Sequence, residues 1–293
     1  MKCSKILVTG SRGQLGRDLM DHLPRTFDVV GFDVDTIDIT NIDAVAAHVK
    51  RVQPDVVIHA AAFTDVDGCE TQEETAMAVN SEGTRNVAAA CHDCGARLIY
   101  YSTDYVFDGQ AEEAYTEDDL PNPQTVYGRS KLAGERAVAA ALEEYAIMRI
   151  SWVYGEHGTN FVKTMLKLGR AQRQSAADGK TVDPIKVVND QVGNPTWTRD
   201  VVRQTVTVID RRLTGLFHAT AEGICSWYQL ARDTFEFRRM NAVVEPCSSD
   251  EFPRRAVRPA LSALENARLK AAGANDMRDY RVALKEFCDD YEE

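Results

Sequence analysis

SKILVTGSRGQLG, residues 4–16, is the stretch that decides the fold. The apolar run before the first glycine predicts a strand that is buried on both faces of a parallel sheet. Gly10, Gly13 and Gly16 follow at intervals of three residues, and a helix is predicted directly after them, over roughly residues 14–23. A strand, a glycine turn and a helix in this order are typical of the first βα junction of a dinucleotide-binding fold.

The glycine turn is suited to hold a pyrophosphate. Glycine permits a tight turn and a close approach of the backbone, and the helix N-terminus attracts the negative charge. The spacing GxxGxxG is looser than the usual GxGxxG, so the position of the turn carries more weight than the pattern. Asp33 supports this interpretation, because it ends the second predicted strand and can accept a hydrogen bond from the adenosine ribose 2′-hydroxyl.

Two residues bear on which dinucleotide binds. Asp33 would repel the 2′-phosphate of NADPH and therefore favours NADH, whereas Arg12, immediately before Gly13, could attract that phosphate. Because the two act in opposite directions, we expect both NADPH and NADH to be usable. Their kcat/KM values should then differ by less than about 1000-fold, or roughly 4 kcal/mol.

The remaining chain alternates between strands and helices up to about residue 155. Further strands are predicted over 27–33, 54–62, 97–107 and 146–155, and further helices over 41–52, 74–95 and 126–144. Such alternation indicates right-handed βαβ units and an α/β fold with a doubly wound parallel sheet of the Rossmann type.

A second, smaller substrate-binding domain is expected beyond that point. The later predicted elements are a helix over 160–174, a polar loop over 174–184, a strand over 185–191, a helix over 198–212 and a strand over 215–220. The last two look like a return to the sheet. We therefore expect a dinucleotide-binding domain of residues 1–154 and 192–220, and a substrate domain of residues 155–191 and 221–293.

Composition and charge limit the partners and the cellular setting. The chain has 293 residues, is 44% hydrophobic and carries a formal net charge of −11, which argues against nucleic acid or an anionic membrane as a partner. Its apolar runs are too short for a signal peptide or a membrane span. Seven cysteines, an odd number that includes Cys3 and an isolated CxxC pair at Cys91 and Cys94, predict no disulfide framework. A cytoplasmic setting is expected.

The segment QTVYGRSKLAGE, residues 124–135, predicts a catalytic pair. Tyr127 and Lys131 are four residues apart on a predicted helix and share a face. A nearby ammonium group should lower the tyrosine pKa from its usual value of about 10. Such a phenol can donate a proton to a carbonyl oxygen that gains charge. A tyrosine and a lysine also occur at this spacing by chance, but Ser102 and Thr103 at the end of the fourth strand favour catalysis.

Together these motifs resemble the extended short-chain dehydrogenases and reductases and, within them, the dTDP-4-dehydrorhamnose reductase family. The resemblance runs along nearly the whole chain, through motifs at 10–16, 35–40, 61–70, 102–109, 126–135, 149–155, 160–166, 187–196, 215–220 and 258–264. The sequences STDYVF, SWVYG and NDQxGxPT, in this order, are the most specific to the 4-ketoreductase branch.

The resemblance implies an activity and a catalytic trio. The activity is the NAD(P)H-dependent reduction of the 4-keto group of dTDP-4-dehydro-6-deoxy-L-mannose to dTDP-L-rhamnose. Thr103 would hydrogen-bond the C4 carbonyl, and Tyr127 would supply the proton. Lys131 would tune Tyr127 and bind the nicotinamide ribose.

The resemblance and the glycine turn together give the binding residues. Expected cofactor-binding residues are Gly10, Arg12, Gly13, Gln14, Leu15, Gly16, Asp33, Asp38, Ile39, Ala62, Phe63, Thr64, Tyr127 and Lys131. Expected substrate-binding residues are Thr103, Asp104, Trp152 and Arg258. Trp152 would present a flat apolar surface to the deoxysugar. Arg258 would bind the diphosphate, since a guanidinium fork suits phosphate oxygens, with Arg254 and Arg255 as alternatives.

The sequence departs from the family pattern at a metal position. Some members bind magnesium at a dimer contact; Asp18 matches one position of that site, but Arg199 stands where another carboxylate would be. We therefore expect no metal here and no dimer of that particular kind, although a homodimer of another kind remains open. The loop over 174–184 is also longer and more polar than the resemblance implies.

Alternative functions remain open. A sibling 4-ketoreductase acting on another nucleotide-linked deoxysugar would share all these motifs. Epimerases and dehydratases share the tyrosine and lysine, but dehydratases carry further acids after the threonine, where this chain has only Asp104. A non-catalytic regulatory subunit, similar to the beta subunit of methionine adenosyltransferase, would share the fold. The presence of Thr103, Tyr127 and Lys131 favours an enzyme.

Overall fold

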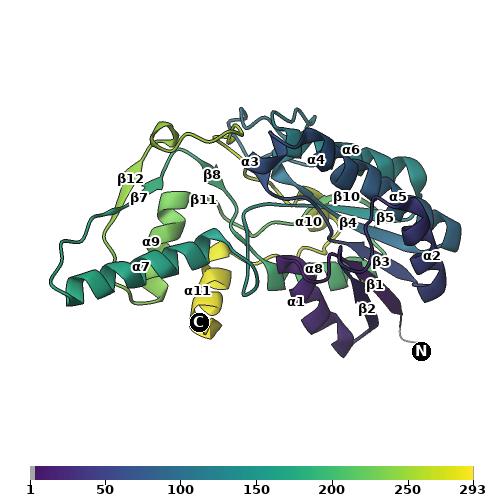
Figure 1. Ribbon diagram of the computed structural model, residues 1–293, viewed down its shortest axis with the longest axis horizontal. Coiled ribbons are helices and arrows are strands. Elements are labelled where there is room, and N and C mark those ends of the chain that lie inside the picture. Colours follow the sequence, from purple (N-terminus) through teal and green to yellow (C-terminus); the bar gives the residue numbers. More distant parts are fainter. Residues whose placement is uncertain (1–3, 293) are drawn as a thin grey trace.

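The computed structural model describes residues 4–292, so Cys3 and the outermost ends of the two predicted domain ranges lie outside the described residues. Figure 1 shows a larger part built on a twisted sheet and a smaller, mainly helical part beside it. No helix among residues 4–292 combines the length and apolar character needed to cross a membrane.

The larger part is organised by one parallel sheet. Within the described residues this sheet has six strands in the order β10-β5-β4-β3-β1-β2, and every neighbouring pair is parallel. Their bounds are β1 Lys5–Thr9, β2 Asp28–Phe32, β3 Val56–His59, β4 Arg97–Thr103, β5 Tyr145–Ile150 and β10 Gly215–His218. The strand order reverses between β1 and β3, where doubly wound folds bind their ligands. The predicted fold class is confirmed.

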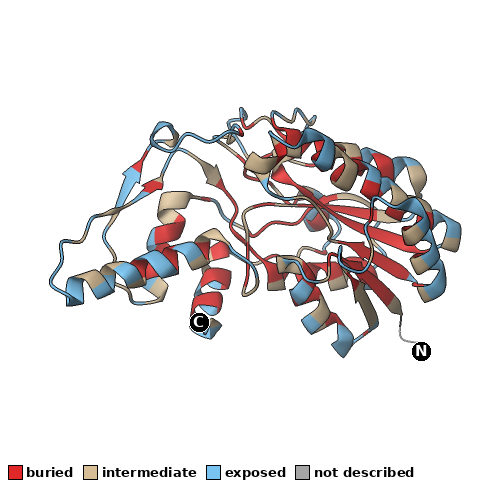
Figure 2. Cartoon of the chain, in the orientation of Figure 1, coloured by how far each residue is buried: buried red, intermediate tan, exposed pale blue. Residues whose placement is uncertain are grey.

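Helices cover both faces of the sheet. The helices α1 (Gln14–His22) and α8 (Thr198–Asp210) pack on one face, and α2 (Ile42–Val52), α5 (Thr84–Cys94) and α6 (Val126–Ala141) pack on the other. Each face has its own apolar core, and the four central strands β1, β3, β4 and β5 are buried along most of their length (Figure 2). The near-continuous apolar strands of the sequence are explained by this double coverage.

The predicted helix over 74–95 is present, but it contains a π-helical turn that the sequence did not predict. It consists of α4 (Glu73–Met77), a π-helical turn η2 (Ala78–Gly83) and α5, and it is preceded by the short α3 (Val66–Cys69). A π-helical turn inside a helix frequently marks a functional site. Gly95 ends α5 as predicted, with a φ of 69°.

Two predicted strands end early because the chain turns at their carboxyl ends. After β4 the chain forms the 3-10 turn η3 (Asp104–Val106), and after β5 it bends before the short β6 (Val153–Tyr154). Trp152 occupies that bend with a φ of 46°, a left-handed conformation that is uncommon for a bulky residue. The bend redirects the chain from the sheet into the smaller part.

The smaller part packs around three helices, α7 (Phe161–Ala177), α9 (Trp227–Phe237) and α11 (Tyr280–Asp290). The strands outside the large sheet are short: β7 Ile185–Val188, β8 Val192–Gly193, β9 Thr196–Trp197, β11 Cys225–Ser226 and β12 Val244–Cys247. Because α7 continues to Ala177, the start of the predicted polar loop is helical instead. The 3-10 turns η1 (Leu23–Arg25) and η4 (Ser249–Glu251) and the helix α10 (Ala267–Ala271), which packs beside β10, complete the described elements.

Candidate active site

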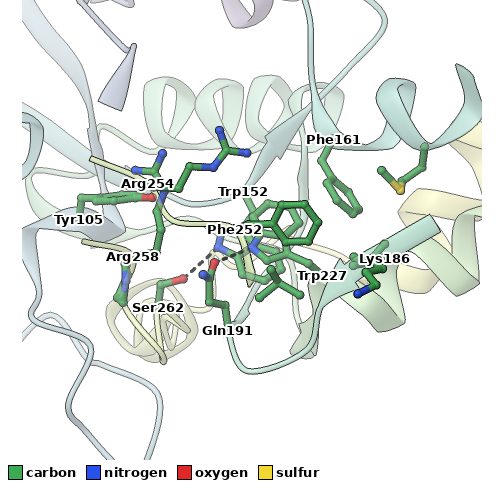
Figure 3. Close-up of a pocket in the computed structure, with 14 residues that line it drawn as sticks. Tyr105, Trp152, Phe161, Lys186, Gln191, Trp227, Phe252, Arg254, Arg258 and Ser262 are labelled. Atoms are coloured by element: carbon green, nitrogen blue, oxygen red, sulfur yellow. Dashed lines mark hydrogen bonds between the residues drawn. The ribbon is translucent and has the colours of Figure 1, made fainter. Parts of the chain in front are cut away.

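Adjoining cavities run along the carboxyl edge of the sheet and into the smaller part. The first cavity, about 430 Å³, lies around Gly10, Asp33 and Phe63. The central cavity, also about 430 Å³, is lined by Tyr127 and residues of the β4 end. The aromatic cavity, about 510 Å³, lies between the two parts of the molecule and is shown in Figure 3. Gly13, Ala60 and Ala62 line both the first and the central cavity, and Tyr105 and Trp152 line both the central and the aromatic one.

The predicted catalytic residues Thr103, Tyr127 and Lys131 all line the central cavity. Thr103 ends β4, and the other two lie in the first turns of α6. The start of that helix is fixed by two side chains: Thr125 Oγ1 accepts a hydrogen bond from the Gly128 amide at 3.0 Å, and Glu70 Oε1 accepts one from the Val126 amide at 2.9 Å. Both bonds satisfy amide groups that a helix N-terminus leaves free, so Tyr127 is held by a capped helix.

Tyr127 has a raised pKa, which contradicts the direction expected from the sequence. Burial raises the pKa of this phenol, a hydrogen bond with Thr103 opposes the rise, and the charge of Asp104 adds to it. The expected lowering by Lys131 is wrong, because desolvation of the phenolate outweighs any contribution from the lysine. Tyr127 is therefore a protonated phenol throughout the neutral pH range.

Lys131 is buried, with 3% of its surface exposed. Burial lowers its pKa to about 7, against the opposing effect of Glu135. Its Nζ lies 4.2 Å from the centroid of the Tyr100 ring, a cation–π contact. The charge of Glu135 acts on Lys131, but its two oxygens already accept hydrogen bonds from Arg149, from Nε at 2.9 Å and from Nη2 at 2.8 Å. Lys131 thus titrates close to physiological pH.

Thr103 is oriented by its neighbour Asp104. Its hydroxyl donates to Asp104 Oδ1 at 2.9 Å and accepts a hydrogen bond from the Tyr105 amide at 3.2 Å. Burial raises the pKa of Asp104 to about 6, while the bond from Thr103 lowers it. A carbonyl ligand therefore competes with a carboxylate for the Thr103 proton.

The glycine turn leaves no room for side chains at two of its three positions. Gly10 has a φ of 65°, and a Cβ there would lie 2.6 Å from the Ala61 nitrogen. A Cβ on Gly16 would overlap the carbonyl oxygen of Gly10. At Gly13 the nearest atom would be 3.3 Å away, so close packing inside the turn does not alone require glycine there. Gly13 instead lines both the first and the central cavity, where a side chain would intrude on a ligand.

All predicted cofactor-binding residues line the first or the central cavity. Gln14 connects the turn to the smaller part, since its Nε2 donates to the Val153 carbonyl at 3.1 Å and its Oε1 accepts from Asn160 at 3.2 Å. Asp38 Oδ1 accepts hydrogen bonds from the amide and the hydroxyl of Thr40, at 2.9 and 2.8 Å. These contacts fix the walls of the cavities before any ligand arrives.

Asn80 is a site residue that the sequence did not reveal. It lies in the π-helical turn, where its Oδ1 accepts from the Phe63 amide at 2.8 Å and its Nδ2 donates to the Phe63 carbonyl at 3.0 Å. The same Nδ2 donates to Ser130 Oγ at 3.0 Å, and Ser130 in turn donates to the Tyr127 carbonyl at 2.8 Å. One amide side chain thus joins the predicted cofactor loop to the helix of Tyr127. A polar residue inside an apolar helical pattern was the only available signal.

A second unpredicted group lies beneath the glycine turn. His59 Nδ1 is 2.6 Å from Thr9 Oγ1, and its Nε2 is 3.1 Å from Thr84 Oγ1. Burial lowers the pKa of His59 to about 3, with a further contribution from Lys131, so the ring is neutral. Thr9 Oγ1 also accepts a hydrogen bond from the Ala61 amide at 3.2 Å, so the group links β1 to the segment after β3.

The aromatic cavity contains a pair of stacked indoles. Trp152 and Trp227 lie parallel, with ring centroids 3.5 Å apart and an interplanar angle of 4°. Trp152 Nε1 donates to Ser262 Oγ at 3.0 Å, and Trp227 Nε1 donates to Gln191 Oε1 at 3.1 Å (Figure 3). One face of Trp152 is therefore covered by a residue that the sequence did not single out. Only the rest of that indole is available to a ligand.

Arg258, a predicted substrate-binding residue, lines the aromatic cavity, and one of its nitrogens is uncommitted. Its Nη2 donates to Asp67 Oδ2 at 2.8 Å, and its guanidinium lies 5.8 Å from the Tyr105 ring centroid. Its buried Nη1, like the buried Ser102 Oγ of the central cavity, has no hydrogen-bond partner among residues 4–292. A buried polar atom of this kind is suited to a ligand. Arg254 lines the same cavity.

Charged side chains surround Arg199, which stands where magnesium-binding relatives are expected to carry a carboxylate. Arg199 forms ion pairs with Glu156 and, at 3.2 Å, with Asp290. Asp18 lies nearby with Asp21 and His157, in a group that could hold an ion. His157 Nε2 is 3.2 Å from Asp21 Oδ2, so these groups already interact with one another. The absence of a metal stays a prediction.

A doubly wound parallel sheet, a glycine turn at its switch point and a threonine, tyrosine and lysine in one cavity define a Rossmann-type protein of the dehydrogenase and reductase class. Residues 4–293 match the family of the RmlD substrate binding domain, and the chain belongs to that family. The resemblance inferred from the sequence is confirmed.

Relatives of known structure or sequence are similar over nearly their whole length. A dTDP-4-dehydrorhamnose reductase from Clostridium acetobutylicum is 44% identical, with a TM-score of 0.92 over 97% of this chain and 98% of that one. One from Bacillus anthracis, solved in complex with NADP, is 39% identical, with a TM-score of 0.92 over 98% and 99% of the two chains. A dTDP-4-keto-6-deoxy-D-glucose reductase from Streptomyces niveus is 38% identical over 95% of this chain and 94% of its own.

Proposed function

We propose that this chain reduces the 4-keto group of dTDP-4-dehydro-6-deoxy-L-mannose to give dTDP-L-rhamnose, with NADPH or NADH as the reductant. The observation that carries the proposal is the joint position of Thr103, Tyr127 and Lys131. They line a cavity that adjoins the glycine turn on one side and a cationic aromatic cavity on the other. Two similar structures are named dTDP-4-dehydrorhamnose reductase, and one of them holds NADP, which supports the proposal.

The first and central cavities suit a dinucleotide. When bound, the reduced nicotinamide supplies a hydride to C4 of the sugar. Asp33 would accept a hydrogen bond from the adenosine ribose, and the amides at the start of α1 would meet the pyrophosphate beside Gly13. Lys131 would bind the nicotinamide ribose next to Tyr127. The obligatory absence of side chains at Gly10 and Gly16 leaves the backbone open to that approach.

Tyr127 would supply the proton. As the carbonyl carbon is reduced, negative charge develops on its oxygen, and Thr103 and Tyr127 can both donate hydrogen bonds to it. Burial holds the pKa of Tyr127 above its usual value, so the phenol is protonated at neutral pH. An alkoxide is a stronger base than a phenolate, which makes transfer from this phenol favourable.

The aromatic cavity would hold the rest of the sugar nucleotide. Trp152, Trp227 and Phe252 offer apolar ring surfaces, and Arg254 and Arg258 offer positive charge. A flat base with a diphosphate has the complementary chemistry, because guanidinium groups bind phosphate oxygens through paired donors. The buried Nη1 of Arg258 is the donor best placed for this role.

The proposal has three further parts. The dinucleotide would be bound by residues 1–154 and 192–220, and the sugar nucleotide by residues 155–191 and 221–293. The protein would act in the cytoplasm, where the six cysteines that are free within residues 4–292 stay reduced. It would self-associate as a homodimer, which light scattering of the purified protein tests directly.

A coupled assay tests the function. The protein is supplied with dTDP-4-dehydro-6-deoxyglucose, a 3,5-epimerase and NADPH or NADH, and the absorbance of the reduced nicotinamide is followed while the product is identified by NMR. We expect cofactor oxidation that depends on the epimerase, with dTDP-L-rhamnose as the product. Oxidation without the epimerase would instead indicate a 4-ketoreductase for another deoxysugar, as the name of the Streptomyces niveus relative suggests.

A regulatory subunit would behave differently in the same assay. It would bind a dinucleotide but oxidise none with any sugar nucleotide, and it would form a stable complex with a partner enzyme. Turnover that is lost on replacing Tyr127 would reject this alternative.

A further inference from the structure

The mouth of the first cavity carries a charge arrangement that the proposed cofactor roles do not explain. Arg12 and Asp33 line the cavity, but the partner of the Arg12 guanidinium is a third residue, Asp35, which does not. Arg12 Nη1 donates to Asp35 Oδ2 in an ion pair at the protein surface. Among residues 4–292, Arg12 is the only cationic residue that lines this cavity, and its ion-pair partner Asp35 lies outside the cavity.

Asp33 is fixed by the backbone and not by Arg12's side chain. Its Oδ2 accepts a hydrogen bond from the Arg12 amide at 2.8 Å, and its Oδ1 accepts one from the Val34 amide at 2.8 Å. A carboxylate oxygen can accept more than one hydrogen bond, so Asp33 can still accept one from a ribose hydroxyl. Within residues 4–292, the guanidinium of Arg12 pairs with Asp35 and makes no hydrogen bond to Asp33.

The position of Asp35 is set by a tight turn. The Thr36 hydroxyl donates to the Asp33 carbonyl at 2.7 Å and accepts a hydrogen bond from the Asp33 amide at 3.1 Å, and the Thr36 amide donates to the same carbonyl at 2.9 Å. Asp35 lies inside this turn, directly before Thr36. The backbone that carries Asp35 is therefore held in a hydrogen-bonded turn.

The ion pair is exposed and can be broken. The side chains of Arg12 and Asp35 are 62% and 51% exposed. Exposed pairs contribute little stability, about 0.2–1 kcal/mol, and salt screens them. A phosphate monoester with a charge of about −1.5 to −2 is a stronger partner for a guanidinium than one carboxylate. Arg17, the neighbouring cation, is less available, since its Nε donates to the Arg12 carbonyl at 3.1 Å.

We propose that Asp35 determines the choice between NADPH and NADH by competing with the 2′-phosphate for the guanidinium of Arg12. The inference rests on the proposed function, because it assumes a dinucleotide in the first cavity. NADPH must take Arg12 from Asp35, whereas NADH needs only Asp33 and leaves the ion pair intact. Asp35 thus weakens NADPH selectively, and the protein accepts both reductants because the competing pair is weak.

A double-mutant cycle on binding tests the proposal. Dissociation constants for NADPH and NADH are measured by calorimetry at low ionic strength for the unchanged protein, Asp35→Asn, Arg12→Gln and the double variant. We expect Asp35→Asn to shift the ratio of the two constants toward NADPH by about 5-fold, the upper range for an exposed pair. Arg12→Gln should shift it toward NADH by about 10-fold, as expected for losing a phosphate contact.

The coupling between the two positions is the decisive measurement. If Asp35 acts through Arg12, the effect of Asp35→Asn in the Arg12→Gln background should fall below about 2-fold. Asp43→Asn, which removes an equal charge from the exposed start of α2, is the matched control and should leave the ratio unchanged. Raising the salt concentration should reduce the Asp35→Asn effect, because the pair is exposed.

The outcomes separate this inference from the proposed function. An equal effect of Asp35→Asn on both dinucleotides, or the same effect with and without Arg12, would overturn the role of Asp35 while leaving the reductase proposal standing. Failure of the unchanged protein to bind either dinucleotide would overturn both.

Discussion

The two ends of the chain of cavities are built in different ways. The dinucleotide end is formed by the glycine turn, the β2 end and the segment after β3, and its shape comes from backbone contacts such as those of Gly10 and Gly16. The aromatic end is formed by side chains from distant segments, with Trp152, Trp227 and Ser262 in contact although they are far apart in sequence. The first end leaves no room for a Cβ at Gly10 or Gly16, whereas the second depends on side chains that can be exchanged. This difference indicates that the position of the cofactor is set by the backbone of the fold, whereas the position of the substrate is set by exchangeable side chains.

Tyr127→Phe should have the largest effect, because it removes the proton donor where the two ends meet. We expect kcat to fall by roughly 100-fold or more, the usual scale for losing a general acid. The Kd for the reduced dinucleotide should change little, since the aromatic ring remains. Steady-state kinetics and a fluorescence titration of the dinucleotide measure the two quantities. Near-normal turnover would remove Tyr127 from the mechanism.

Gly16→Ala compared with Gly13→Ala tests the backbone construction of the dinucleotide end. A Cβ on Gly16 overlaps the Gly10 carbonyl, so Gly16→Ala should lower the free energy of unfolding by about 1–3 kcal/mol, the usual cost of overpacking. Gly13→Ala places its Cβ 3.3 Å from the same carbonyl, so it should lower the unfolding free energy less than Gly16→Ala and weaken dinucleotide binding more. Denaturant titration with and without the dinucleotide distinguishes them. Equal losses of stability would contradict the assignment of different roles.

Lys131→Met tests whether the charge of Lys131, in the central cavity between the two ends, makes dinucleotide affinity depend on pH. Burial lowers the pKa of Lys131 to about 7 from its usual range near 10.5, so the ammonium form is present below about 7 and is lost as the pH rises through that value. Dinucleotide affinity that depends on this charge should therefore fall above pH 7, by up to about 10-fold per pH unit. The fall should be absent in Lys131→Met. Titrations between pH 7 and 9, as rough bounds, avoid the titration of Asp104 near 6.

Trp227→Ala and Trp152→Ala test the side-chain construction of the aromatic end, and the effect expected is the smallest. Both substitutions break the indole stack, which is worth about 0.5–1.5 kcal/mol beyond the area buried. We expect KM for the sugar nucleotide to rise by about 10-fold in each, with the dinucleotide Kd unchanged. Steady-state kinetics with saturating dinucleotide measures the change. An effect confined to Trp152 would show that its partner only fills space.

The parts of the site that could be predicted are those encoded locally. The three-residue spacing of Gly10, Gly13 and Gly16 predicts a turn. The four-residue spacing of Tyr127 and Lys131 predicts that both lie on one face of a helix. The pKa direction of Tyr127 could not be predicted, because it depends on burial by segments that are remote in sequence. The stacking of Trp152 on Trp227 could not be predicted either, because a contact between two residues far apart in the chain leaves no periodic pattern in the sequence.

The fold was predictable for the same physical reason. Apolar strands buried on both faces and helices of regular length carry their own pattern, so the order of strands and helices follows from the sequence. The π-helical turn η2 did not, because Asn80 lies at a position that a regular helix would also accept. Its importance comes from Phe63, which approaches only when the chain is folded.

The hydrogen bonds that Asn80 makes to Phe63 and Ser130 have a consequence for local unfolding of the protein. The amide of Phe63 belongs to a loop, yet its hydrogen-bond acceptor is held by the network that ends at Ser130 and the start of α6. That amide can exchange only after its hydrogen bond to Asn80 breaks. Its hydrogen exchange should therefore be as slow as that of the helix, in one cooperative unit with it, whereas the neighbouring Thr64 amide is free to exchange with the loop.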